Sequence, residues 1–253
     1  MLYIIGIGLG NEKDITIDAL EVLKKCESIY LECYTSNIGF DIKKLEELTG
    51  RKIILADRNL VENNAGIIIE NAKNNETAFL VKGDVFSATT HISLLTTAME
   101  NKVKWKILHN ASILTAVSDT GLMLYKFGKT TSIPFNNVNT ESPYKVLKDN
   151  LLIGAHTLFL LDIKSSEEFM NYKEGIKYLL NIEQKKKLEI FNENTKIVVC
   201  AGLGSENAAI KYGSAAELKK ISIEVYPQCI IIPAKLHFTE EEMLNTFSSH
   251  QQQ

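Results

Sequence analysis

Residues 83 to 91 include several types that would be poor choices if the segment only packed against a core. Their sequence is Gly-Asp-Val-Phe-Ser-Ala-Thr-Thr-His. They follow a short apolar run, Thr77 to Val81, of the kind that forms a strand buried on both faces. Thr89 or Thr90 is placed to cap the helix that follows. Asp84 and Ser87 are therefore expected on a loop at the carboxyl end of a parallel strand, where open α/β sheets bind ligands. The Asp84 carboxylate either closes an Asx turn or lies near a cationic ligand.

Two other predicted strands also end in turns of small or polar residues. Leu2 to Ile7 runs into a glycine-rich turn that contains Leu9, and Trp105 to Leu108 runs into a turn that contains Ser112. In a parallel sheet, these turns and the one at Asp84 lie at the same edge. Their convergence predicts one ligand pocket more strongly than any single turn does.

The glycine turn Gly6-x-Gly8-x-Gly10 also suggests a dinucleotide site, but its details disagree. In the dinucleotide fingerprint the third glycine comes three residues after the second, whereas here it comes two residues after. The acidic residues Glu12 and Asp14 would repel a diphosphate. Because Glu32 ends the next strand and could contact a ribose, a dehydrogenase stays a minority hypothesis.

The alternation of strands and helices predicts an α/β protein of two domains, residues 1–110 and 111–253. Five strands joined by short right-handed crossovers would form a parallel sheet in the first domain. These strands are expected at 2–7, 28–32, 52–56, 77–81 and 105–108, with helices around 19–23, near 41–48, over 63–73 and through 92–98. The second domain is expected to begin with a helix over 113–127, to have strands at 130–133, 157–161, 196–200 and 229–232, and to carry a solvated helical face within 165–194.

Composition excludes several classes of function. The 253 residues carry a net charge of −3, which argues against nonspecific nucleic-acid binding. No apolar run approaches the roughly 20 residues that span a bilayer, and no secretory signal is evident, so we expect a cytoplasmic protein without membrane contact. The five histidines and four cysteines lack metal-ligand spacing, so no metal site is predicted. No nucleophile and base pair is evident, so the catalytic residues stay unassigned and positioning of two activated reactants is the expected chemistry.

Several strings of residues together resemble the diphthine synthases, a family in the tetrapyrrole-methylase-like superfamily of S-adenosylmethionine-dependent enzymes. They include the start Met-Leu-Tyr-Ile-Ile-Gly-Ile-Gly-Leu-Gly, Leu31-Glu-Cys-Tyr-Thr-Ser36, Gly83-Asp-x-Phe-x-Ala-Thr-Thr-His91 and His109-Asn-Ala-Ser-Ile113. The similarity extends over nearly the whole chain, with further matches at Gly121 to Gly128, Leu160 to Lys164 and Ala234 to His237.

This resemblance implies two α/β domains of the tetrapyrrole methylase type, with a parallel sheet in the first, a mixed sheet in the second and a ligand cleft between them. It implies a homodimer that binds S-adenosylmethionine, releases S-adenosylhomocysteine and methylates the 3-amino-3-carboxypropyl-histidine of translation elongation factor 2. The cofactor contacts that it implies are Leu9, Asp84, Ser87, Ser112, Ile113, Ile163, Leu203 and His237. The alternatives are a methylase that acts on a tetrapyrrole and a non-catalytic module that binds the elongation factor.

Overall fold

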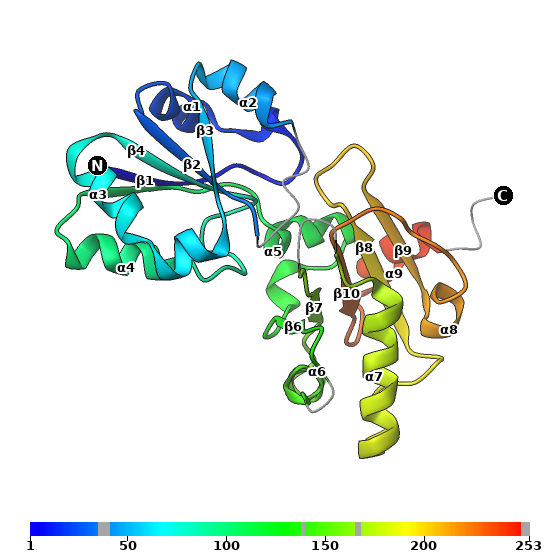
Figure 1. Cartoon of the computed structure of the whole chain (residues 1–253). Coiled ribbons are helices and arrows are strands. Elements are labelled where there is room, and N and C mark those ends of the chain that lie inside the picture. Colours follow the sequence, from blue (N-terminus) through cyan, green and yellow to red (C-terminus); the bar gives the residue numbers. More distant parts are fainter. Residues whose placement is uncertain (35–40, 138–139, 165–167, 249–253) are drawn as a thin grey trace. The chain divides into compact units, whose positions relative to one another are not determined.

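The computed structural model describes residues 1–34, 41–137, 140–164 and 168–248. The chain divides into two compact α/β units, coloured from blue to green and from green to red in Figure 1. Unit 1 comprises Met1–Ala116 with Gly204–Glu206, and unit 2 comprises Val117–Leu203 with Asn207–Gln253. Thr35 and Ser36, which belong to one of the family-like strings, lie outside the described residues.

The sheet of unit 1 is entirely parallel, and its strand order is β3-β2-β4-β1-β5. This order places β1 between β4 and β5, so the turns that follow these three strands are close neighbours. The five predicted strands are all present. Their bounds are β1 (Leu2–Gly6), β2 (Ser28–Glu32), β3 (Ile53–Ala56), β4 (Thr77–Val81) and β5 (Trp105–Leu108).

Four helices cover the two faces of this sheet (Figure 1). Because side chains alternate along a strand, Leu2 and Ile4 of β1 face one way and Ile5 faces the other. The first pair packs in a cluster with residues of α3 (Gly66–Asn74) and α4 (Ile92–Glu100). Ile5 packs in a cluster with residues of α1 (Ile17–Leu23) and α2 (Ile42–Thr49). A strand covered on both faces must be apolar throughout, which explains the continuous apolar runs in the sequence.

Two details of the helices in unit 1 differ from the sequence predictions. The expected cap of α4 is wrong: His91 occupies the N-cap position, and the Thr89 hydroxyl instead donates to the Val85 carbonyl at 2.7 Å. The helix predicted over 63–73 begins at Gly66, after a π-helical turn over Asn59–Asn63. The loop between Asp84 and α4 is therefore held by its own hydrogen bonds, and no threonine side chain caps the helix.

Unit 2 contains a mixed sheet of order β6-β7-β10-β8-β9, in which β6 and β7 are parallel and the other pairs are antiparallel. The predicted fold class is therefore confirmed. The strand β9 was not predicted, because this edge strand is mostly half-buried and lacks an apolar run. The strands are β6 (Thr131–Ile133), β7 (Thr157–Leu161), β8 (Lys196–Ala201), β9 (Ala209–Ser214) and β10 (Gln228–Ile232), and the helices are α5 (Ile113–Ala116, in unit 1), α6 (Ser142–Leu152), α7 (Tyr172–Lys186), α8 (Ala215–Leu218) and α9 (Phe238–Thr246).

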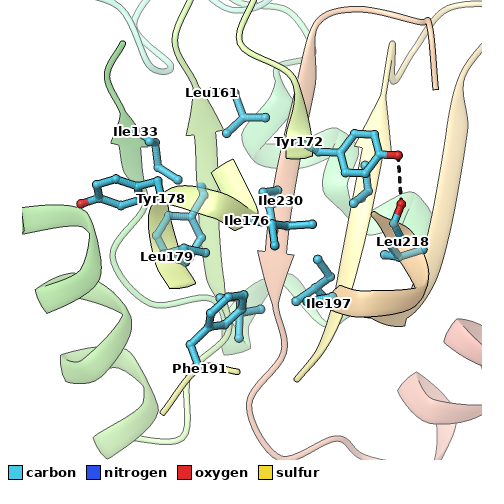
Figure 2. Close-up of a cluster of buried hydrophobic side chains, with 14 of the residues drawn as sticks. Ile133, Leu161, Tyr172, Ile176, Tyr178, Leu179, Phe191, Ile197, Leu218 and Ile230 are labelled. Atoms are coloured by element: carbon cyan, nitrogen blue, oxygen red, sulfur yellow. Dashed lines mark hydrogen bonds between the residues drawn. The ribbon is translucent and has the colours of Figure 1, made fainter. Parts of the chain in front are cut away.

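The core of unit 2 forms where α7 packs on this sheet, as Figure 2 shows. Ile176 and Leu179 of α7 lie in one cluster with Ile230 of β10. The Tyr172 hydroxyl shares its proton between two backbone carbonyls at the end of α8, that of Leu218 at 3.1 Å and that of Ile221, just after the helix, at 2.6 Å. The polar stretch predicted as a solvated helical face therefore contains a helix with one face in the core, and its exposed face carries the lysines near residue 186.

The continuous helix predicted over 113–127 is wrong. In the structure α5 ends at Ala116, a 3₁₀ turn follows over Val117–Thr120, and Gly121 then adopts a left-handed conformation with φ of 82°. A Cβ at Gly121 would lie 2.3 Å from Cγ of Met243 in α9. Gly121 therefore ends the helical stretch through both its backbone conformation and the close approach of α9.

Candidate active site

Three strand-end turns of unit 1 meet around Gly83. The turns after β1 and β4 are joined by backbone hydrogen bonds between Gly8 and Gly83, with N–O distances of 2.8 and 3.2 Å. Gly83 has a positive φ of 79°, and a Cβ built on it would lie 3.5 Å from Leu9 Cδ2 and 3.9 Å from Ser112 Cα. The sheet edge thus brings Leu9, Gly83 and Ser112 together, as the pattern of turns predicted. Their role as ligand contacts stays a prediction.

Asp84 is the best-connected side chain at this edge, and it is 9% exposed. Its Oδ1 accepts hydrogen bonds from the Phe86 N–H at 3.3 Å and the Ser87 hydroxyl at 3.1 Å. Its Oδ2 lies 2.7 Å from Nδ1 of His109 and accepts from the Asn110 N–H at 3.2 Å. The carboxylate therefore closes its own turn and also ties that turn to the residues after β5.

Four donors nearly exhaust the hydrogen-bonding capacity of a carboxylate. Desolvation alone would raise the pKa of Asp84, but the hydrogen bonds from His109, Asn110, Phe86 and Ser87 outweigh it and lower the pKa. Asp84 is therefore ionised at neutral pH. Since its oxygens are already occupied by the protein, Asp84 would act on a bound cation chiefly through its charge and through the turns that it fixes in place.

His109 and Asn110 are the site residues that sequence reasoning did not single out, although both stand in one of the family-like strings. The Asn110 side-chain amide donates to the Gly6 carbonyl at 3.1 Å and to the Asp14 carbonyl at 2.9 Å. It thereby links the turn after β5 to the glycine turn after β1. Two polar residues directly after a strand at the same edge as Asp84 were the signal that could have found them.

Side chains of unit 1 also occupy the backbone N–H and carbonyl of Gly10 in the glycine turn. These contacts bear on the dinucleotide alternative. Oδ2 of Asp14 accepts a hydrogen bond from the Gly10 N–H at 2.6 Å, and the Lys82 ammonium donates to the Gly10 carbonyl at 3.1 Å. Burial lowers the pKa of Lys82 to about 8. A dinucleotide pyrophosphate needs free N–H groups at the start of a helix, whereas here a carboxylate occupies one of them and a 3₁₀ turn follows over Glu12–Asp14. The geometry disfavours a dehydrogenase.

Ser87 and Ile113 lie beside the three turns in sequence and differ in their surroundings. The Ser87 hydroxyl belongs to the hydrogen-bond network of Asp84. Ile113 is the first residue of α5, immediately after the buried Ser112, and is half-buried itself. Five of the eight predicted contact residues therefore fall in unit 1, around or next to the junction at Gly83.

The other three predicted contact residues lie on separate segments of unit 2, and no hydrogen bond between described residues links them. Ile163 follows β7 and forms a β-bridge with Phe169. Leu203 follows β8 and is buried. His237 is exposed at the N-cap position of α9, with its Nδ1 2.9 Å from the Thr239 hydroxyl. Their assignment as cofactor contacts stays a prediction.

The backbone at His237 is held by a buried carboxylate. Glu240 is fully buried and accepts hydrogen bonds from the His237 N–H at 2.8 Å and the Met123 N–H at 2.9 Å. It also forms an ion pair with Lys126 and lies 3.0 Å from Nε2 of His156. Desolvation would raise the pKa of Glu240, but these contacts outweigh it and lower the pKa to about 2. The carboxylate thus fixes the start of α9 in its charged form.

Across 1–34, 41–137, 140–164 and 168–248, no three His, Cys, Asp or Glu side chains are grouped in a way that could hold a metal ion. Within the same residues, every helix is too short or too polar to cross a membrane.

The similarity to known proteins covers nearly the whole chain. Residues 1–219 match the family model of the tetrapyrrole (corrin/porphyrin) methylases. A diphthine synthase from Methanocaldococcus jannaschii is 45% identical over 250 residues, which cover 96% of this chain and 97% of that protein. A probable diphthine methyl ester synthase from Arabidopsis thaliana is 41% identical over 271 residues, which cover 98% of each chain.

A solved structure is similar to this chain as well and points to the same family. The crystal structure of a diphthine synthase matches with a TM-score of 0.89 at 33% identity, and the match covers 98% of this chain and 96% of that one. The family model and the relatives assign methyl transfer to this fold, so the chain is a methyltransferase. It belongs to the tetrapyrrole methylase family and, within that family, to the diphthine synthases.

Proposed function

We propose that the chain transfers methyl groups from S-adenosylmethionine to the 3-amino-3-carboxypropyl-histidine of translation elongation factor 2, a step in diphthamide synthesis. The names of relatives that are 41% and 45% identical over nearly their full length support this assignment. The observation that carries it is the junction of three turns around Gly83, with an ionised and nearly buried Asp84 beside it.

The residues at this junction fit a compact, positively charged methyl donor. The Leu9 side chain is apolar and half-buried, and the buried Gly83 has no side chain to fill the space beside it, where a Cβ would lie 3.7 Å from the Ala111 carbonyl oxygen. The negative charge of Asp84 favours a cation over a phosphate at this junction. Leu9, Gly83, Ser112 and Ile113 would hold the donor. The donor itself supplies a methyl group on a sulfonium, which is a good leaving group.

The protein's own contribution is placement. The backbone bonds between Gly8 and Gly83, and those of the Asn110 side chain to the glycine turn after β1, fix the donor side of the site before a ligand arrives. Positioning two reactants in line accounts for roughly 7–11 kcal/mol of barrier lowering in favourable systems. A rigid junction of three turns is suited to this task because few groups must be ordered when the donor binds.

The amine and the carboxylate of the acceptor group differ in whether they need a base before they react. An amine must lose a proton before its lone pair attacks the methyl carbon, whereas a carboxylate is ionised at neutral pH and needs no base. The archaeal relative is named diphthine synthase, and the plant relative is named probable diphthine methyl ester synthase. Only the second name includes an ester. The chain resembles both to a similar degree, so the number of methyl groups has to be measured.

Intact-mass analysis of elongation factor 2 tests the proposal. The factor carrying the unmethylated 3-amino-3-carboxypropyl group is incubated with the purified protein and S-adenosylmethionine, and a parallel sample omits the protein. We expect a gain of three methyl groups if only the amine reacts and of four if an ester also forms. No gain with the factor, together with methylation of uroporphyrinogen, would establish the tetrapyrrole alternative. Binding of the factor without any methyl transfer would establish the non-catalytic alternative.

A further inference from the structure

A short segment from the second half of the chain packs against the glycine turn of unit 1. It lies in the loop between β8 and β9. Its residues Gly204–Glu206 belong to unit 1, although the residues on both sides of them belong to unit 2. Gly204 directly follows Leu203, one of the predicted cofactor contacts. The segment therefore adds residues from far along the chain to the junction around Gly83.

Gly204 lies so close to Leu9 that a side chain at this position would clash. Its φ is 83°, and a Cβ built on it would lie 2.6 Å from Cβ of Leu9 and 3.4 Å from Cδ1 of the same residue. Because Cβ of Leu9 is attached to the backbone, the contact at 2.6 Å could be relieved only if one of the two backbones moved. Glycine is therefore required here both by the left-handed conformation and by the approach of Leu9.

Gly10 makes a second close approach to the same segment. A Cβ built on Gly10 would lie 2.4 Å from the carbonyl oxygen of Gly204. The φ of Gly10 is not in the left-handed region, so the close approach alone accounts for a glycine at this position. Gly10 and Gly204 thus let two stretches of backbone meet directly.

The Leu9 side chain reaches from this contact to Gly83. Its Cδ1 lies 3.4 Å from the Cβ position of Gly204, and its Cδ2 lies 3.5 Å from the Cβ position of Gly83. One methyl group of Leu9 is therefore directed toward each glycine. Any shift of the segment at Gly204 would change the place of the Leu9 side chain beside Gly83.

Stability alone is a poor reason for this contact. Glycine loses more conformational entropy on folding than any other residue, and a contact between two backbones buries little apolar surface. Gly204 itself stays exposed. The contact does hold one side chain, that of Leu9, in a defined position.

We propose that Gly204 is a positioning residue of the donor site, which holds the Leu9 side chain in place beside Gly83. This inference rests on the proposed function, in which S-adenosylmethionine packs at this junction. Gly204 acts through Leu9 and takes no part in the transfer of the methyl group. A side chain at Gly204 would push Leu9 toward Gly83, into the space that the donor occupies, and would weaken binding by overpacking.

Calorimetry with S-adenosylhomocysteine tests this role, at a temperature well below the melting temperature of every variant. We expect Gly204→Ala to bind about 5- to 150-fold more weakly than wild type. Gly154→Ala is the matched control. Gly154 has a φ of 70°, and a Cβ built on it has no neighbour within 4 Å, so the variant has similar backbone strain without a clash. It should bind as wild type does.

Leu9→Gly shows whether Gly204 acts through Leu9. This substitution removes the Cβ that a new Cβ at Gly204 would meet. Leu9→Gly alone should bind more weakly than wild type, because the apolar side chain is lost. Adding Gly204→Ala to Leu9→Gly should then change the affinity by less than about twofold, so the two losses should not add.

A second variant covers the case in which Gly204→Ala does not fold. Gly10→Ala presses on the same segment without left-handed strain, since two of the three atoms nearest to its Cβ belong to Gly204. It should also weaken binding. Wild-type affinity in the variant used, an equal loss in Gly154→Ala, or the same loss with and without Leu9→Gly would overturn the role of Gly204. A wild-type protein that does not bind S-adenosylhomocysteine would instead overturn the proposed function.

Discussion

Replacing Gly83 with alanine should separate ligand binding from folding. The residue has a φ of 79°, and a Cβ there would lie 3.5 Å from Leu9 Cδ2 and 3.7 Å from the Ala111 carbonyl oxygen. These are ordinary contact distances, so the protein itself accommodates the methyl group. The cost to folding is therefore mainly the left-handed backbone, about 1–2 kcal/mol for a residue with a Cβ. The stiffer unfolded chain offsets roughly 0.4–1 kcal/mol, which leaves about 1 kcal/mol.

Gly50 provides a matched control in the same unit. It ends α2 with a φ of 70°, and a Cβ built on it has no neighbour within 4 Å. Gly50→Ala therefore introduces the same backbone strain without filling any space near the site. We expect the two variants to lose the same stability in urea denaturation, about 1 kcal/mol each.

The two variants should differ in cofactor affinity. The new methyl group at Gly83 takes the space between Leu9 and Ser112 in which a ligand would pack, and overpacking of this kind costs about 1–3 kcal/mol. In calorimetry with S-adenosylhomocysteine, Gly83→Ala should bind roughly 5- to 150-fold more weakly than wild type, and Gly50→Ala should bind as wild type does. Equal affinities in all three proteins would refute the reasoning, because the ligand would then not lie against Gly83.

Substitutions at Asp84, Glu240 and Gly121 give three further predictions. Asp84→Asn should weaken S-adenosylhomocysteine binding less than Asp84→Ala, because the amide keeps part of the hydrogen-bond network that ties the turns together. Calorimetry measures both affinities. Equal losses of affinity would mean that the network is unimportant for binding. Glu240→Gln should lose about 3–5 kcal/mol in urea denaturation at neutral pH. Because the folded pKa of Glu240 lies below its ordinary value, the stability from this carboxylate is present at neutral pH and should fade as pH drops from about 4.5 to 2; wild type and variant should then converge. Gly121→Ala should destabilise the protein, and adding Met243→Ala should recover part of the loss in thermal melting; no recovery would leave backbone strain as the whole effect.

The parallel sheet could be predicted from the sequence because each buried strand must be apolar along its whole length. Thr77–Val81 is such a run, and its five residues are all buried. The turn that follows could also be recognised, since Gly83 and Asp84 break the run at a position where α/β sheets bind ligands. Convergence of the three turns followed from the parallel arrangement alone, without knowledge of any side chain.

The partners of the side chains could not be predicted, because they depend on contacts between residues far apart in the chain. Asp84 meets His109 across 25 residues, and Asn110 meets the Gly6 carbonyl across 104. Nothing in the local sequence indicates that the Asp84 oxygens are already occupied. The helix predicted beyond Ala116 failed for a similar reason: its apolar spacing was helical, but Gly121 and the approach of α9 ended it.

A crystal structure of the protein with S-adenosylhomocysteine would show directly which residues contact the cofactor product. We expect the ligand to lie against Gly83 and to contact Leu9 and Ser112, with the network of Asp84 intact behind it. A ligand bound elsewhere, with these three residues left free of contact, would mean that the junction around Gly83 is not the donor site.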